Sequence, residues 1–305
     1  MTQQKNSRRQ ILIYLLLVFG FSSLFYFLIL LAHGFGGSGG TYVFELMWCP
    51  ALAAMLTLKL HGRNLRELGW KWPKTKYAAM SWFVPLLYAS IAYTIVWTVG
   101  WGGVPNRQFM AQLVRTMGLG ASPAVSTLVY VLFAASFGVI RSMASALGEE
   151  IGWRGFLVPQ LAKTFSFTTT ALISGIVWAC WHYTILIWGG YNEGTPTWYG
   201  LTCFTVMVVS GSFIFAWIRL KSGSLWTGAI LHASHNLYIQ AIYTPLTADT
   251  GKTKWFIDEF GAVLPVISVA FAIYFWSKRG ELRSGPDERA EFVSPHDAIA
   301  DLARS

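Results

Sequence analysis

Eight apolar runs, most of them about as long as a bilayer is thick, constrain the fold of this chain more than any other feature. A hydrocarbon core of about 30 Å needs roughly 20 helical residues to cross it. The runs cover residues 11–32, 42–60, 77–99, 126–161, 167–188, 199–218, 225–243 and 261–276. Backbone amides in lipid have no water to bond, and the runs lack the alternation of barrel strands, so each is expected to be a helix. The sequence predicts an all-α, polytopic membrane protein with about eight transmembrane helices.

Basic residues are distributed unevenly between the two sets of connections. Both termini and one set of loops hold Lys5, Arg8, Arg9, Lys59, Arg63, Arg66, Lys71, Lys74, Lys76, Lys163, Arg219, Lys221, Lys278, Arg279 and Arg283. The opposite loops hold Arg107, Arg115, Lys252 and Lys254. This asymmetry predicts a multi-pass integral membrane protein with both termini in the cytoplasm, in the inner membrane if the cell is bacterial. The net charge of +9 is therefore attributed to orientation in lipid, and no nucleic-acid partner is expected.

The chain is interpreted as one membrane domain in successive parts. Residues 1–124 hold the first three transmembrane helices and their loops, and residues 125–245 hold the helices that carry most of the buried polar groups. Residues 246–279 contain the last transmembrane helix, and the polar tail 280–305 is expected to be disordered. The fourth run, 126–161, would extend about 54 Å as a straight helix. It should therefore be steeply tilted, broken near Gly148, or project beyond the bilayer.

Several ionisable side chains interrupt the apolar runs. Each costs about 2.5 kcal/mol or more on insertion, so such residues mark candidate functional sites. They are Glu45, Arg141, Glu149, Glu150, Arg154, His182, His232 and His235, with Asn236 beside the last two. Glu45 starts its helix at an interface and Arg141 has no motif around it, so both are interpreted as structural.

Counting from the turns brings several of these groups to one depth in the core of the helix bundle. Glu149 and His182 are equidistant from the connection between the fourth and fifth runs, and His232 is expected at a similar level. Glu150 and Arg154 are four residues apart and can pair on one helix face. Glu149 is rotated by about 100° from that face, which leaves it without a partner in its own helix.

The seventh run offers a matching set of groups. His232 and Asn236 are four residues apart and share a face, while His235 lies on another face and is assigned no role. A carboxylate and imidazoles around a wet cavity can activate water, and an amide with an imidazole can stabilise an oxyanion. Alternatively, Glu149, His182 and His232 are two imidazoles and a carboxylate that could bind zinc with water at the open position. Both schemes lead to hydrolysis.

Three motifs resemble those of a known family. "EEIGWRGFL" is similar to the EExxxR motif of the CPBP intramembrane proteases, which include the type II CAAX prenyl endopeptidases and the bacterial Abi proteins. "WACWH" resembles its FxxxH motif, with Trp178 in place of Phe, and "HASHN" resembles its HxxxN motif.

The resemblance implies a role for each motif residue. Glu149 would be the general base and His182 would help to activate water, while His232 and Asn236 would stabilise the oxyanion. Glu150 and Arg154 would form a supporting pair. The family has been described both as zinc-dependent and as glutamate hydrolases, so possible use of zinc stays open.

The sequence therefore favours an intramembrane endopeptidase that hydrolyses membrane-associated protein or peptide substrates, in CAAX-type processing or in bacterial peptide maturation or immunity. Its site is expected to open from the cytoplasmic half of the membrane. A proton-coupled transporter would use the same polar groups as a relay, although no inverted repeat is detected. A non-catalytic membrane binding or immunity protein is the third alternative. The substrate, a need for prenylation and the oligomeric state are not encoded in these motifs.

Overall fold

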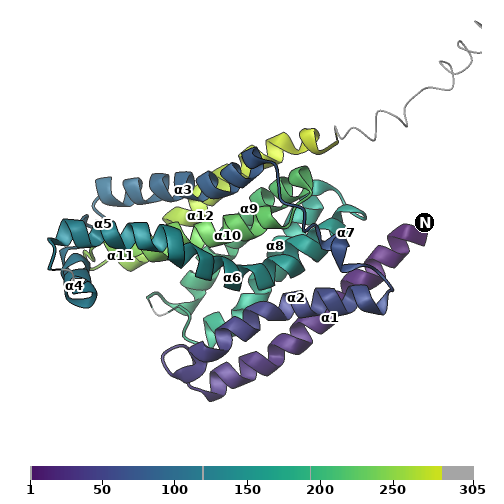
Figure 1. Ribbon diagram of the computed structural model, residues 1–305, viewed down its shortest axis with the longest axis horizontal. Helices are drawn as coiled ribbons and strands as arrows, with labels where there is room; N and C mark the ends of the chain where they lie inside the picture. The colour runs from purple at the N-terminus through teal and green to yellow at the C-terminus, as the bar shows by residue number, and fades with distance from the viewer. Residues whose placement is uncertain (1, 119, 193, 284–305) are drawn as a thin grey trace, which may run out of the picture.

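A computed structural model describes residues 2–118, 120–192 and 194–283, and these residues are almost entirely helical (Figure 1). The α-helices are α1 Thr2–Leu31, α2 Val43–Leu60, α3 Thr75–Thr98, α4 Arg107–Met117, α5 Pro123–Phe133, α6 Val139–Glu150, α7 Val158–Ala162, α8 Phe167–Ile187, α9 Thr197–Ser222, α10 Trp226–Asn236, α11 Thr244–Leu246 and α12 Val263–Ser277. Three π-helical segments, Ala134–Gly138, Ile151–Leu157 and Leu237–Tyr243, join some of them. Most of the expected tail, 280–305, lies outside the described residues.

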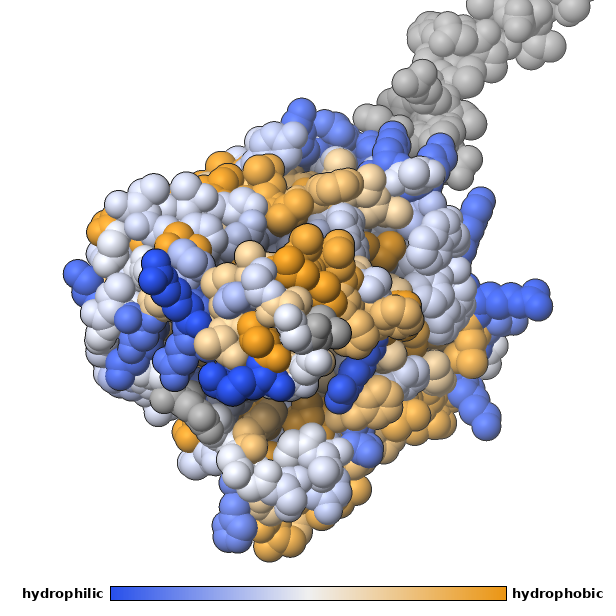
Figure 2. Space-filling view, turned by 60° about the vertical axis from the view of Figure 1, so that its left-hand side comes forward, coloured by the Kyte–Doolittle hydropathy of each residue, from blue (hydrophilic) through white to orange (hydrophobic). Residues whose placement is uncertain are grey.

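Six helical stretches among the described residues are long and apolar enough to cross a membrane. They are Asn6–Leu31, Ser38–Leu60, Thr75–Thr98, Pro123–Ala162, Phe167–Ile187 and Thr197–Ser222. The seventh expected helix is present as α10, continued through a π-helical segment into α11, and the eighth as the 15-residue α12. The predicted all-α, polytopic membrane fold is confirmed, and the chain is an integral membrane protein. Figure 2 shows apolar side chains in the centre and lower right of one face, with hydrophilic side chains left of centre and projecting along the right-hand edge.

The long fourth run is one continuous helical stretch of 40 residues, Pro123–Ala162. It begins where Ser122 accepts a hydrogen bond from the backbone of Val125 and Pro123 occupies the first turn, both common helix-starting features. The stretch is not broken at Gly148, contrary to one of the expected alternatives. It changes instead to π-helical winding at Ala134–Gly138 and again at Ile151–Leu157, directly after Glu150.

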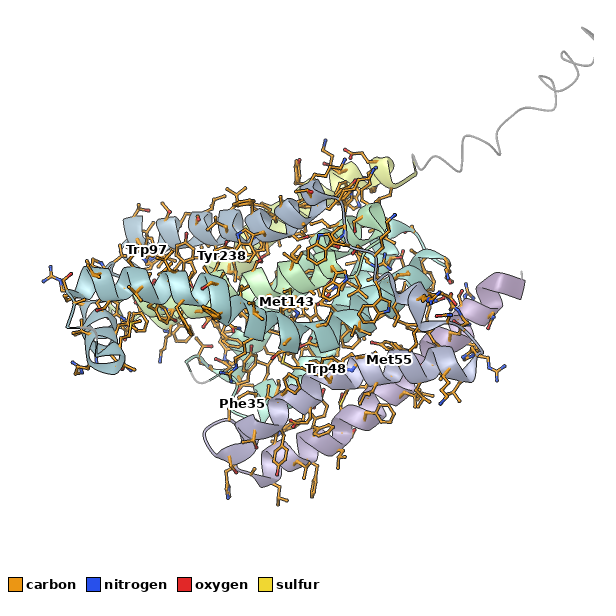
Figure 3. All side chains as sticks on the ribbon, viewed as in Figure 1. Phe35, Trp48, Met55, Trp97, Met143 and Tyr238 are labelled. Atoms are coloured by element: carbon orange, nitrogen blue, oxygen red, sulfur yellow. The ribbon has the colours of Figure 1, made fainter. Side chains whose placement is uncertain are left out.

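Helix α10 lies inside the bundle, where it packs against α3, α6 and α9. The α1–α2 hairpin covers α6 and the segment after it, and α8, α9 and α12 pack together on the other side (Figure 1). Side chains fill the spaces between these helices (Figure 3). The start of α1 and the end of α12 lie toward the right-hand end of Figure 1, and α4 and α11 lie at the left-hand end. The amphipathic α4 was not expected from the apolar runs.

Two glycines allow α2 to approach the fourth helical stretch closely. A Cβ atom on Gly148 would lie 2.6 Å from the backbone oxygen of Met47. A Cβ atom on Gly152 would lie 2.4 Å from Cβ and 2.7 Å from the backbone carbon of Pro50. Small residues at such contacts are typical of helix packing in membranes, where close backbone approach replaces the hydrophobic effect.

We expect Gly152→Ala to lower the free energy of unfolding by about 1–3 kcal/mol, because backbone atoms of α2 cannot move aside cheaply. Thermal unfolding of the purified protein in detergent measures this. Gly20→Ala is the matched control, since a Cβ atom there has no neighbour within 4 Å. Equal melting temperatures for the two variants would contradict the close contact.

Candidate active site

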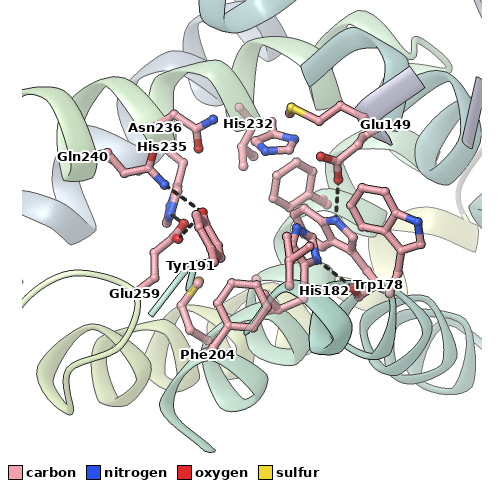
Figure 4. Close-up of a pocket in the computed structure, with 18 of the residues that line it drawn as sticks. Glu149, Trp178, His182, Tyr191, Phe204, His232, His235, Asn236, Gln240 and Glu259 are labelled. Atoms are coloured by element: carbon pink, nitrogen blue, oxygen red, sulfur yellow. Dashed lines mark hydrogen bonds and ion pairs between the residues drawn. The ribbon is translucent and has the colours of Figure 1, made fainter. Parts of the chain in front are cut away.

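A cavity of about 230 Å³ lies in the core of the bundle, and the four expected catalytic residues line it. Glu149 comes from α6, His182 from α8, and His232 and Asn236 from α10. Figure 4 shows these side chains around the cavity, with dashed lines joining both Glu149 and His182 to Trp178. A space of this size holds several water molecules when its walls are polar. The structure thus brings the four residues together, while their chemical roles stay predictions.

The Glu149 carboxylate is 1% exposed and is held by two indoles. Its Oε2 atom accepts hydrogen bonds from Nε1 of Trp178 at 2.7 Å and Nε1 of Trp153 at 3.3 Å. The expectation that Glu149 has no partner in its own helix is therefore wrong, because Trp153 is four residues further along. Both indole bonds go to Oε2, and no hydrogen bond within the described residues engages Oε1.

Glu150 is fully buried and pairs with Arg154, as its spacing predicts. Its Oε1 atom accepts from Nη1 of Arg154 at 2.8 Å and also lies 3.0 Å from Nδ1 of His232. The Arg154 guanidinium is sandwiched between aromatic rings, 4.1 Å from the Trp178 centroid and 3.7 Å from that of Phe215. One carboxylate oxygen therefore links the fourth helical stretch to α10, and the cation that neutralises it is held by cation–π contacts.

Hydrogen-bond partners assign the proton positions on both histidines. Nδ1 of His182 lies 2.9 Å from the backbone oxygen of Trp178, which can only accept, so Nδ1 carries a hydrogen. Nδ1 of His232 donates to the Glu150 carboxylate for the same reason. In each neutral ring Nε2 is then an acceptor. Asn236 is half-buried, and no hydrogen bond engages its side-chain amide within the described residues.

A second polar cluster lines the same cavity and was missed from the sequence. Nε2 of His235 lies 2.9 Å from Oε1 of Glu259, and its Nδ1 lies 2.7 Å from the hydroxyl of Tyr88. The Tyr191 hydroxyl donates to Oε2 of Glu259 at 3.1 Å. His235 belongs to the same helix, α10, as His232 and Asn236. Its contacts in this cluster therefore fix the rotation of α10 about its axis. The signal available in the sequence was the acidic pair Asp258–Glu259 next to the last apolar run.

Asp258 and Glu259 lie outside the membrane-spanning stretches and differ in their pKa values. Burial, reinforced by the charge of Glu259, raises the pKa of Asp258 to about 6. Burial alone would also raise the pKa of Glu259, but the hydrogen bond with His235 and that from Tyr191 outweigh it. The pKa of the Glu259 carboxyl is therefore held below its ordinary value.

The cavity extends toward the helix ends opposite the chain termini. Its walls include Phe35 after α1, Val43 at the start of α2, Tyr191 after α8 and Glu259 before α12. His182 itself lies only five residues before the end of α8 at Ile187. The expectation that the site opens from the half of the membrane containing the termini stays a prediction, because these lining residues do not define the entrance. Counting residues from turns predicted the relative depth of side chains on the helices. It could not predict which loop residues line the cavity.

A zinc site requires its ligand atoms to converge on one point. Glu149, His182 and His232 have suitable ligand atoms, but no group of three His, Cys, Asp or Glu side chains among the described residues converges closely enough to hold a metal ion. In this arrangement the residues do not fit a zinc site, and no chemical step is derived through one.

Comparison with known proteins identifies the region that carries these residues. Residues 128–238 match the family model described as "Type II CAAX prenyl endopeptidase Rce1-like". The matched segment contains all three motifs, and the resemblance inferred from them is confirmed. CAAX prenyl protease 2 from Methanococcus maripaludis is 30% identical over 147 residues, which is 45% of this chain and 51% of that relative. The match thus spans about half the length of the curated relative.

We expect replacement of the two adjacent glutamates to lower the free energy of unfolding by different amounts. Glu150→Gln removes a charge that Arg154 and His232 both contact in a buried site, and it should lower the free energy of unfolding by roughly 3–5 kcal/mol. Glu149→Gln keeps an amide oxygen that can accept from the two indoles, so its melting temperature should stay close to that of the wild type. Melting curves in detergent that reverse this order would contradict the assignment.

The Glu259–His235 pair should make stability depend on pH. Because the folded-state pKa of Glu259 lies below its unfolded value, the pair stabilises the protein above the unfolded pKa, and this stabilisation is lost as the pH falls through the folded pKa. The melting temperature of Glu259→Gln should therefore lie below that of the wild type at about pH 6, and the gap should shrink below about pH 4. Repeating the comparison in Asp258→Asn removes the neighbouring titration. A gap that does not change with pH would contradict the pairing.

Proposed function

We propose that this protein is an intramembrane endopeptidase that hydrolyses peptide bonds in membrane-associated protein or peptide substrates of the CAAX type. The proposal rests on the Oε1 atom of Glu149, which no hydrogen bond engages within the described residues. Two indoles fix Oε2 of this carboxylate, and Oε1 is left available in the cavity that His182 also lines. The matching family model and the curated relative, whose name is CAAX prenyl protease 2, support peptidase chemistry.

In the proposed reaction, a water molecule lies between Oε1 of Glu149 and Nε2 of His182. Glu149 takes a proton as the water attacks the carbonyl carbon of the scissile bond, and His182 orients the water through its unprotonated nitrogen. The proton then passes to the leaving amine as the carbon–nitrogen bond breaks. Burial keeps competing water out of the cavity and strengthens the electrostatic interactions within it.

The oxyanion would be stabilised from α10. The Asn236 amide lines the cavity and has hydrogens free to donate, and His232 can donate from Nε2 when protonated. Glu150 favours that protonated form, because its carboxylate accepts the hydrogen on Nδ1 of the same ring. Donors fixed in a water-poor site commonly supply the largest electrostatic part of catalysis.

The proposal predicts that purified wild-type protein cleaves a fluorogenic farnesylated peptide ending in a Cys-aliphatic-aliphatic-Met sequence. Glu149→Gln and His182→Ala should each lower kcat/KM by at least about 100-fold, the usual scale for removing a general base. Cys180→Ser, on the same helix as His182, is the control and should retain activity. Cleavage that is equal in all variants, or absent from the wild type against a broad peptide library, would refute the endopeptidase and favour the transporter or the non-catalytic alternative.

Zinc dependence is tested on the same preparation. Because the donors are not grouped as a metal site, we expect a chelator to leave the rate unchanged and added zinc not to raise it. Loss of activity on chelation, restored by zinc and not by other divalent ions, would instead support the metal alternative.

The distribution of basic residues supports a topology in which both termini face the cytoplasm. Single cysteines placed beside Lys71 and beside Lys252, in a background lacking the three native cysteines, should then differ in labelling by an impermeant maleimide. In intact cells, the site near Lys252 should react and the site near Lys71 should not. The reverse pattern would contradict the orientation.

A further inference from the structure

The cluster around His235 joins α10 to three other parts of the bundle, and the proposed reaction gives it no role. Nε2 of His235 lies 2.9 Å from Oε1 of Glu259, in the segment before α12. Its Nδ1 lies 2.7 Å from the hydroxyl of Tyr88 on α3, and the hydroxyl of Tyr191, after α8, donates to Oε2 of Glu259. His235 and Glu259 are only 8% and 6% exposed. Buried pairs add little net stability over apolar packing, and their best-attested role is to specify one arrangement of the elements that they join.

The irregular segment before α12 holds the Glu259 carboxylate in place. Asp258 has a φ of 63°, a left-handed conformation that residues other than glycine rarely adopt. Its Oδ1 atom accepts from the backbone N–H of Glu259 at 2.8 Å, and its own N–H donates to the Tyr93 hydroxyl on α3 at 3.2 Å. Such backbone strain persists only where the surroundings fix it, and it is common at functional sites. The segment therefore presents Glu259 to α10 from a fixed position.

Asn236 has no hydrogen bond of its own that fixes its side chain. It lines the cavity, it is half-buried, and its amide is not engaged within the described residues. It also lines a neighbouring groove beside α6, so its amide has two spaces open to it. The α-helical winding of α10 ends at this residue, and π-helical winding begins at Leu237. The direction of the amide therefore depends on how α10 is turned about its axis.

Two contacts on different faces are needed to fix that rotation. The first is the hydrogen bond from Nδ1 of His232 to the Glu150 carboxylate, about which the helix could still turn. His235 lies three residues further on, which places it about 4.5 Å along the helix axis and about 60° around it. Its contact with Glu259 is therefore the second anchor, and it directly precedes Asn236 in the chain.

We propose that His235 and Glu259 are positioning residues, whose contact holds the Asn236 amide toward the oxyanion formed during peptide hydrolysis. The inference rests on the proposed endopeptidase function and extends it to two residues that none of the three motifs assigns. Glu259 lies outside the matched segment 128–238 and reaches the site only through the fold. In this role neither residue touches the reacting atoms, because both act through α10.

A double-mutant cycle with Asn236 tests this role on the purified protein with the fluorogenic farnesylated peptide. Glu259→Ala should lower kcat by roughly 10- to 100-fold with little change in KM, because a small displacement of a catalytic donor has effects of this size. In an Asn236→Ala background the same substitution should lower kcat by less than about twofold, since the donor that it would misplace is already gone. Glu259→Gln, whose amide oxygen can still accept from His235, should retain part of the rate.

Two further variants separate positioning from a general loss of stability. Tyr199→Phe removes a hydrogen bond to Trp255 in the same irregular segment without touching α10, and it should leave kcat unchanged. Tyr88→Phe removes only the hydroxyl on the other side of the imidazole, and it should lower kcat by a smaller factor with the same dependence on Asn236. It keeps the test decisive if Glu259→Ala does not fold. An equal loss of kcat with and without Asn236, or a loss confined to KM, would overturn the proposal.

Hydrogen–deuterium exchange followed by mass spectrometry tests the anchor without requiring activity. Glu259→Ala should raise backbone exchange in residues 235–243 by about tenfold or more, while exchange in residues 151–157 should stay as in the wild type. Unchanged exchange in residues 235–243 would refute the anchor even if the protein is a peptidase. Faster exchange there in a protein that cleaves no peptide would refute the proposed function alone.

Discussion

The contact of one carboxylate oxygen with two partners is the interaction on which the site depends. Oε1 of Glu150 meets both the Arg154 guanidinium and the ring of His232, and all three groups are buried. The contact joins the fourth helical stretch to α10 and fixes the orientation of the imidazole. A Cβ atom on Gly228 would lie 2.4 Å from the other oxygen of Glu150, so this part of α10 can approach only because it has no side chain there.

The two neighbouring carboxylates have different environments because a helix turns by about 100° per residue. Glu150 pairs with the Arg154 cation and links the fourth helical stretch to α10 through His232. Glu149 faces the cavity, where two indoles bind one of its oxygens without neutralising the charge. The change to π-helical winding begins at the next residue, Ile151, and brings Trp153 and Arg154 around these carboxylates. Such local winding is often found at functional sites.

Side-chain contacts that follow from helix geometry were predicted from the sequence. Contacts that depend on loops and on the packing of helices were not. Spacing within one helix predicted the Glu150–Arg154 pair, and distance from a turn predicted that Glu149 and His182 lie at one depth. The contact of His232 with Glu150 required the rotation of α10, which a residue count does not contain. Glu259 lies in an irregular segment before α12, so no periodicity placed it beside His235. The residues that follow α1 and α8, Phe35 and Tyr191, also line the cavity, and no periodicity placed them there.

We propose that Glu149 and His182 hold a single water molecule between them. A density map of the protein in a lipid nanodisc, at a resolution that shows ordered water, tests it most directly. We expect a water within hydrogen-bond distance of Oε1 of Glu149 and Nε2 of His182, with the Asn236 amide directed at the same cavity. A cavity filled by packed side chains, or a Glu149 carboxylate turned away from His182, would contradict it.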